Sequence, residues 1–246
     1  MEYLYDLLVN LHWGAVGQII LIDLLLGGDN AVVIALACRD LPHKHRLQGI
    51  VIGTAGAILL RVILITCAVA LLDLPFLKVA GGALLVWIGV KLLLPEAEKT
   101  DEKIASSTKL YIAVNLQFKI LIAVKTIIIA DFVMSLDNVL AIAAAAQQAH
   151  DDHQTLLVIF GLLVSIPFIV FGSQIVLAFL DRFPIIVWFG GALLGWIAGS
   201  MISTDSVVLG HLPQLAEYHT VACVAGAALV VVIALLLRKR RAAQGA

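Results

Sequence analysis

The stretch DLLLGGDNAVVIALA at residues 23–37 resembles a second stretch, DFVMSLDNVLAIAAA, at residues 131–145. Both stretches are apolar except for a few acidic and amide side chains, which is the composition of a helix inside a membrane. The polar positions correspond at one common offset of 108 residues: Asp23, Asp29 and Asn30 match Asp131, Asp137 and Asn138. The two stretches therefore predict a membrane protein with an internal repeat.

The repeat extends beyond these two motifs. Gly53 corresponds to Gly161 and Asp73 to Asp181 at the same offset, and GGALLVWIG at 81–89 corresponds to GGALLGWIA at 190–198. Three membrane crossings are thus duplicated, and because three is odd, the second copy must run through the membrane in the opposite sense. Inverted repeats of this kind place a substrate site near the midplane of secondary transporters.

Composition agrees with a polytopic membrane protein. The 246 residues are 62% hydrophobic and 13% charged, with a mean hydropathy of +1.06, whereas soluble domains are roughly 45–50% apolar and about 25% charged. A water-soluble monomer is excluded. At about 20 residues per crossing, we expect an all-α fold of seven transmembrane helices, near residues 16–38, 47–72, 76–94, 121–147, 155–180, 184–203 and 220–237.

These crossings predict four segments. Residues 1–94 form the first three-helix repeat, residues 95–120 a charged cytoplasmic connector, and residues 121–203 the second repeat. Residues 204–246 hold a seventh helix, which has no counterpart in the repeat, and a basic tail.

The basic residues predict the orientation in the membrane. With the N-terminus outside and the C-terminus in the cytoplasm, 14 of the 16 Lys and Arg residues lie on the cytoplasmic side. Only Lys78 lies near an outer end and only Arg61 lies inside a crossing. The positive-inside rule selects this orientation for a multi-pass protein of the bilayer. The formal net charge of −1 gives no reason to expect a nucleic-acid partner.

The acidic residues of the motifs are candidate metal ligands. A carboxylate inside the membrane costs at least about 2.5 kcal/mol, so the four motif aspartates together cost on the order of 10 kcal/mol and need neutralising partners. Aspartate and asparagine offer only oxygen, and neither His nor Cys lies near either motif, so Mn²⁺, Mg²⁺ or Ca²⁺ fits better than a soft metal. We therefore expect the metal ligands to be Asp23, Asp29, Asn30, Asp131, Asp137 and Asn138, with no organic cofactor.

Two further residues are possible supports for this site. The thioether of Met134 would favour Mn²⁺, although core packing is the better interpretation of this residue. Arg61 is an intramembrane cation, which we expect to pair with an aspartate or to occupy the empty site. Because carboxylates that lie close together repel one another, some should be protonated without metal, which offers a route to metal/proton exchange.

Two arrangements of the aspartates remain open. On a straight helix Asp23 and Asp29 differ by about 120° around the axis and ~9 Å along it, so they cannot both hold one ion. Either Gly27 and Gly28 break the first helix, or the helices stay regular. In the second case Asp29 meets its counterpart at the midplane, with Asp23 toward the outside and Asp131 toward the inside. We favour a mixture in which the first helix is the more deformed, since Ser135 and Leu136 replace the glycine pair in the second repeat.

With both motifs identified, the sequence resembles the TerC family of integral membrane proteins, and within it the YjbE-like branch. The resemblance rests on DLLLGGDNAVVIALA and DFVMSLDNVLAIAAA and covers the first to the sixth helix. It implies seven crossings, a bacterial cytoplasmic (inner) membrane and export of Mn²⁺ from the cytoplasm. It also implies that the acidic residues at 23, 29, 131 and 137 are metal ligands. A homodimer stays open.

Two other function classes compete with a cation exporter. An intramembrane aspartyl protease would also need two aspartates on neighbouring helices. Its Gly-x-Gly-Asp signature fails here because Leu26 stands where the first glycine belongs, and a protease gives no reason for four duplicated aspartates. We therefore expect no enzyme. The second competitor is a membrane partner that senses metal without transporting it.

Overall fold

The computed structural model describes residues 17, 20, 21, 23, 28–66, 75–94, 109–147 and 154–244. These residues form helices and short connections, and no strand occurs among them. Residues 17, 20, 21 and 23 are helical. The helices are α3 (Gly28–Cys38), α4 (His43–Thr66), α6 (Leu77–Leu93), α7 (Lys109–Gln147), α8 (Gln154–Arg182), α9 (Ile185–Ser203), α10 (Ser206–His211), the 3₁₀ helix η2 (Pro213–Ala216) and α11 (His219–Gln244).

The all-helical membrane fold is confirmed, while the number of crossings stays a prediction. Every range that we expected to cross the membrane contains a helix. Within the described residues, four helices are long and apolar enough to span a bilayer: His43–Ile65, Ile159–Arg182, Ile185–Ser203 and His219–Arg241. Asp73 lies outside the described residues.

Large apolar side chains on the outside of the helices fit a lipid environment. Leu59, Phe171 and Phe189 each expose 65% or more of their surface. A soluble monomer rarely exposes contiguous apolar surface, whereas acyl chains accept it at no cost. These outer helix faces therefore fit an environment of acyl chains.

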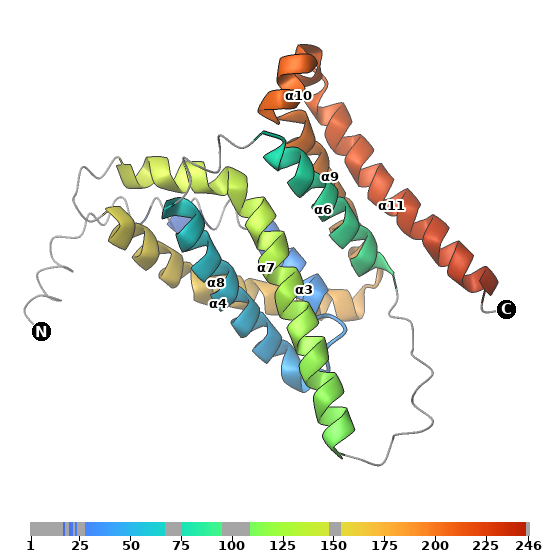
Figure 1. Cartoon of the computed structure of the whole chain (residues 1–246). Coiled ribbons are helices and arrows are strands. Elements are labelled where there is room, and N and C mark those ends of the chain that lie inside the picture. Colours follow the sequence, from blue (N-terminus) through green and yellow to red (C-terminus); the bar gives the residue numbers. More distant parts are fainter. Residues whose placement is uncertain are drawn as a thin grey trace, which may run out of the picture.

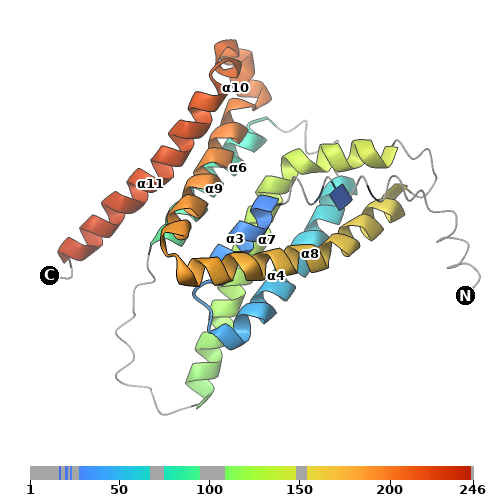
Figure 2. The same ribbon diagram turned by 180° about the vertical axis from the view of Figure 1, so that it is seen from behind.

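The helices form two groups, which Figures 1 and 2 show from opposite sides. One group consists of α3, α4, α7 and α8, and the other of α6, α9 and α11. In the first group, α3 contacts α8 and α7 contacts α4, so each motif helix packs on the second helix of the other half of the chain. The two motif helices, α3 and α7, also contact each other. This packing brings the two motifs to one place.

Helix α7 differs from the crossing that we expected at residues 121–147. It begins at Lys109, inside the segment predicted as connector. Figure 1 also shows that its C-terminal part turns away from the direction of the rest of the helix. The expectation that the first motif helix is the more deformed of the two stays a prediction, because residues 24–27 lie outside the described residues. Gly27 lies outside the described residues, so the predicted break in the first motif helix stays a prediction.

Small residues allow the last helix, α11, to pack closely against α9. A Cβ added at Gly195 would collide with the carbonyl oxygen of Gly226, and one added at Gly199 with that of Ala222. Helices α9 and α11 therefore approach at backbone distance, which is the usual role of small residues spaced by four in membrane helices. The seventh helix packs in this way onto α9 and also contacts α6.

Candidate functional site

Arg61 of α4 lies at the centre of a buried ion cluster. Its side chain is 1% exposed, and each of its three guanidinium nitrogens donates a hydrogen bond. Nη1 donates to Asp23 Oδ1, Nη2 donates to Asp131 Oδ1 at 2.6 Å, and Nε donates to Ser135 Oγ at 3.0 Å. One aspartate of each sequence motif is thus bound by the same guanidinium.

Two serines complete the hydrogen bonding of the carboxylates. Ser135 Oγ, which accepts from Arg61, donates to Asp131 Oδ2 at 3.1 Å, as its position one helical turn after Asp131 allows. Ser165 Oγ of α8 lies 2.5 Å from Asp23 Oδ2 and 2.8 Å from the carbonyl oxygen of Leu162, and its one proton can serve either acceptor. The cluster therefore joins four helical segments: the one that carries Asp23, α4, α7 and α8.

The composition of the cluster follows from the cost of burying charge. An ion taken out of water loses several kcal/mol even after relaxation, and only excellent geometry offsets that loss. Arginine suits such a position because its planar fork presents several donors at fixed angles. With one cation and the two carboxylates of Asp23 and Asp131 ionised, the cluster carries a net charge of −1.

Part of the predicted arrangement is wrong. The predicted pairing of Arg61 with aspartate is confirmed. The alternative in which both motif helices stay regular, however, placed Asp23 toward the outside and Asp131 toward the inside. Because both carboxylates bind the same guanidinium, they cannot lie at opposite entrances of a path. A long arginine side chain joins the two positions that straight-helix geometry keeps apart.

Asp29 and Asn30 contrast with this satisfied cluster. Buried atoms of both residues, Oδ1 of Asp29 and both Oδ1 and Nδ2 of Asn30, have no hydrogen-bond partner in the described structure. The buried hydroxyl of Thr54 in α4 also has no hydrogen-bond partner in the described structure. Asp29 nevertheless lies close enough to feel the charges of Arg61 and Asp131. Buried polar atoms without partners are rare and call for an explanation, of which an absent ion is one.

The remaining predicted site residues are less informative. The side chains of Asp137 and Asn138 lie outside the described residues, although their backbone belongs to α7. Met134 packs in an apolar cluster with Val33 and Leu85, as core packing predicts. Among the described side chains, no group of three or more His, Cys, Asp or Glu residues could hold a metal ion.

Little in the sequence pointed to the two serines as partners of the aspartates. Ser135 is four residues after Asp131, so the helical repeat could have placed it on the same face. Ser165 carries no such signal, because serines in membrane helices commonly bond a carbonyl of their own helix. Ser173 does so here, with its hydroxyl 2.8 Å from the carbonyl oxygen of Ile169.

Comparison with known proteins places these observations in a family. The model of the integral membrane protein TerC family matches residues 9–243. The uncharacterized membrane protein YjbE of Bacillus subtilis is 40% identical over 231 residues, which cover 94% of each chain. The B. subtilis membrane protein YceF is 25% identical over 77% of this chain and 70% of its own. The UPF0053 inner membrane protein YgdQ of Escherichia coli is 22% identical over 70% of this chain and 73% of its own. No solved structure matches the chain.

Proposed function

The chain belongs to the integral membrane protein TerC family, and from this premise we propose that it transports a divalent metal cation out of the bacterial cytoplasm. The motif aspartates and asparagines offer only oxygen ligands, which suit Mn²⁺, Mg²⁺ and Ca²⁺ better than a soft metal. Mn²⁺ is the cargo that we favour among them, because the family resemblance implies export of that ion. Mg²⁺ and Ca²⁺ are the competing ions.

The observation that carries the proposal is the contrast between two sets of buried polar groups. Asp23 and Asp131 are each bound by Arg61 and by a serine. Asp29 and Asn30 have buried oxygen atoms with unused bonding capacity, and Asp29 lies within electrostatic reach of Arg61 and Asp131. A membrane protein that leaves such atoms unpaired pays a free-energy cost, which a cation that binds them would offset.

This contrast assigns two roles to the motif residues. In our proposal Asp29 and Asn30 bind the cargo, together with the matching Asp137 and Asn138 of the second motif. Asp23 and Asp131 are held by Arg61, so they fix the relative positions of the helices and add a net negative charge that attracts the cation. A metal that bound Asp23 or Asp131 directly would first have to displace a guanidinium.

The packing of the two halves supports a transporter. The contacts of α3 with α8 and of α7 with α4 are matched pairs under the sequence repeat, and the two motif helices contact each other. Transporters built from inverted repeats bind their substrate at such an interface and move one repeat against the other. Carboxylate ligands lose their protons when they bind a metal, so exchange of metal for protons is the coupling that we expect.

Flux in liposomes tests the proposal. Purified protein is reconstituted into vesicles that enclose a dye for divalent metals, and Mn²⁺, Mg²⁺ and Ca²⁺ are added outside, with an imposed proton gradient as a second condition. We expect Mn²⁺ influx through the inverted fraction of the protein, and we expect it to stop in Asp29→Asn. Asp40→Asn is the matched control, because Asp40 is an exposed carboxylate that is paired with Arg39 in the turn after α3.

The same vesicles separate the alternatives. A metal sensor or a non-transporting partner would bind Mn²⁺ in calorimetry without flux, and this result would overturn the transport proposal. If a folded protein showed neither Mn²⁺ binding nor flux, Mn²⁺ would be excluded as a ligand. In cells that have no redundant exporter, loss of the protein should raise total manganese under manganese load.

A further inference from the structure

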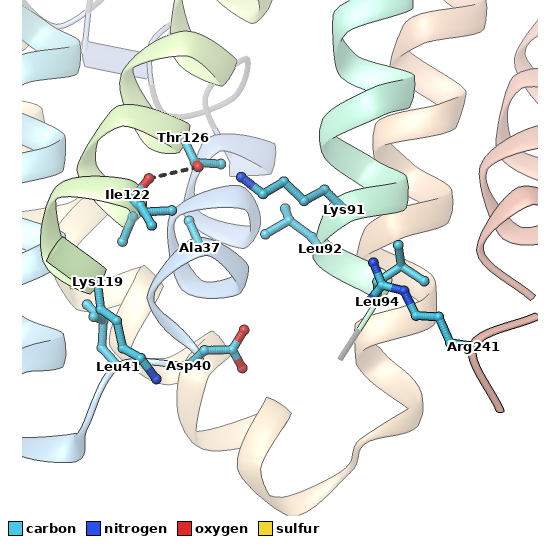
Figure 3. A pocket seen from close by; sticks show the side chains of 11 residues that line it. Ala37, Asp40, Leu41, Lys91, Leu92, Leu94, Lys119, Ile122, Thr126 and Arg241 are labelled. Carbon is cyan, nitrogen blue, oxygen red and sulfur yellow. Dashed lines mark hydrogen bonds between the residues drawn. The ribbon is translucent and has the colours of Figure 1, made fainter. Parts of the chain in front are cut away.

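The hydroxyl of Thr54 in α4 takes no part in the ion cluster around Arg61. Thr54 is 1% exposed, and its Oγ1 has no hydrogen-bond partner in the described structure. Hydroxyls in membrane helices commonly bond a carbonyl of the preceding turn. Thr126 of α7 does so, because its Oγ1 donates to the carbonyl oxygen of Ile122 at 2.8 Å (Figure 3). Thr54 leaves this bond unmade, so its hydroxyl is available to a group outside its own helix.

Helix α4 runs antiparallel to the part of the chain that carries the first motif. Near the turn that joins α3 to α4, a Cβ added at Gly49 would lie 3.1 Å from Cys38 Sγ. Farther along α4, Arg61 binds Asp23. The partner of α4 thus changes from residue 38 to residue 23 as α4 proceeds from residue 49 to residue 61. Residues between these two contacts therefore face each other in reverse order.

This packing places Thr54 at about the same level as Asn30. Thr54 is seven residues before Arg61, which is about two helical turns and puts both side chains on one face of α4. Asn30 is seven residues after Asp23, the partner of Arg61. Asn30 is 3% exposed and neither atom of its amide group has a hydrogen-bond partner, as is also true of Asp29 Oδ1. Unsatisfied polar atoms from α3 and α4 are thus buried in the same part of the fold.

These unsatisfied atoms include a donor as well as acceptors. Oδ1 of Asp29 and Oδ1 of Asn30 accept, Nδ2 of Asn30 only donates, and the hydroxyl of Thr54 can do both. A bare cation would bind the oxygen atoms but would give the amide N–H groups no acceptor. A water molecule both donates and accepts, and hard cations such as Mg²⁺ keep several of their waters when they bind to proteins. A partly hydrated cation therefore matches the whole set.

We propose that Thr54 is a further residue of the cargo site and that, together with Asn30, it holds a water molecule that stays on the bound cation. This inference rests on the proposed metal site and adds to it a residue from outside the two motifs. At the offset of 108 the position that matches Thr54 is Leu162, which is apolar and buried. The first repeat alone supplies this hydroxyl.

Calorimetry with Mn²⁺ on the full-length protein in detergent tests the role of Thr54. Thr54→Val keeps the shape of the side chain and removes the hydroxyl, so Mn²⁺ affinity should fall about tenfold, as expected for one hydrogen bond to a charged group. Thr54→Ser keeps a hydroxyl and should restore most of the affinity. Thr126→Val is the matched control, because it removes a hydroxyl that is bound within its own helix, and its Mn²⁺ affinity should be unchanged.

Thermal unfolding of the metal-free protein separates cargo binding from a structural role. The hydroxyl of Thr54 has no partner to lose, so Thr54→Val should leave the unfolding temperature unchanged or raise it. A lower unfolding temperature together with unchanged Mn²⁺ affinity would make Thr54 a structural residue and would overturn the inference.

Electron paramagnetic resonance of bound Mn²⁺ tests the water molecule. In water labelled with the magnetic oxygen isotope, the Mn²⁺ lines of the unaltered protein should broaden, and they should broaden less in Thr54→Val. Equal broadening in both proteins, or none in the unaltered protein, would overturn the role of Thr54 in holding a metal-bound water.

The inference and the proposed function fail in different ways. If Asp29→Asn loses Mn²⁺ affinity while Thr54→Val binds as the unaltered protein does, the metal site stands and Thr54 is excluded from it. If the folded, unaltered protein binds no Mn²⁺, the proposed function and this inference are both overturned.

Discussion

Replacing Arg61 by glutamine should destabilise the protein more than any other single change in the cluster. It leaves two buried carboxylates, Asp23 and Asp131, without their shared cation. Removing one partner of a buried ion pair costs about 3–5 kcal/mol. At about 2–4 °C per kcal/mol for a chain of 150–250 residues, the unfolding temperature should fall by roughly 6–20 °C.

Two other variants show whether the stability loss in Arg61→Gln comes from the ion cluster or from substituting any charged residue. Asp131→Asn alone should cost only about 1–2 kcal/mol, because Arg61 keeps Asp23 and the amide oxygen can still accept a hydrogen bond. Arg39→Gln is the control for loss of an arginine: its partner Asp40 is exposed, and exposed pairs contribute about 0–1 kcal/mol.

The double variant Arg61→Gln/Asp131→Asn gives the decisive comparison. Once the arginine is gone, removing one carboxylate also removes its repulsion of the other, so the double variant should be more stable than Arg61→Gln alone. We expect the sum of the stability losses in the two single variants to exceed the loss in the double variant by about 2–3 kcal/mol, which is near the top of the range for contacting residues. Unfolding temperatures and denaturant midpoints are measured in detergent for the unaltered protein, the two single variants and the double variant. Additivity within about 0.5 kcal/mol would refute the cluster as described.

Three further outcomes are expected. Asp29→Asn should lower Mn²⁺ affinity in calorimetry at least tenfold without lowering the unfolding temperature of the metal-free protein, because its Oδ1 has no partner to lose and the change removes a charge from a buried position; an affinity equal to that of Asp40→Asn would exclude Asp29 as a ligand. Gly199→Leu should cost about 1–3 kcal/mol by forcing α11 off α9, whereas Gly210→Leu, where an added Cβ meets nothing within 4 Å, should be neutral. In a variant without its native cysteines, a cysteine introduced at position 151 should react with an impermeant reagent from outside the cell, and reaction only from the cytoplasm would reverse the predicted orientation.

Apolar runs located the helices but not their ends. Each expected crossing contains a helix because a backbone in lipid must satisfy its hydrogen bonds internally. Hydropathy measures the part of a helix inside the membrane, however, and helix formation continues beyond it. Helix α7 therefore begins at Lys109, although the sequence predicted a crossing only from residue 121 onward.

The site was predictable in composition and less so in geometry. Buried aspartates without local cations demand partners, which is why the sequence already pointed to Arg61. The positions of Asp23 and Asp131 were judged from straight helix axes, and that reasoning omits the reach of an arginine side chain between two helices. Ser165 could not be found from sequence because its partner Asp23 is 142 residues away and nothing in its neighbourhood marks it.

The cluster breaks the symmetry that the sequence repeat implies. Asp23 and Asp131 correspond at the offset of 108, but the position that matches Arg61 is Ile169, an apolar residue buried in α8. Two equivalent carboxylates therefore share a cation that only the first half supplies. If one repeat moves against the other during transport, as we propose, Arg61 moves with the first repeat and the second repeat has no arginine at the matching position. The outward and inward states then differ in the energy of this ion cluster, so the protein has a preferred resting state that its repeated carboxylates alone would not create.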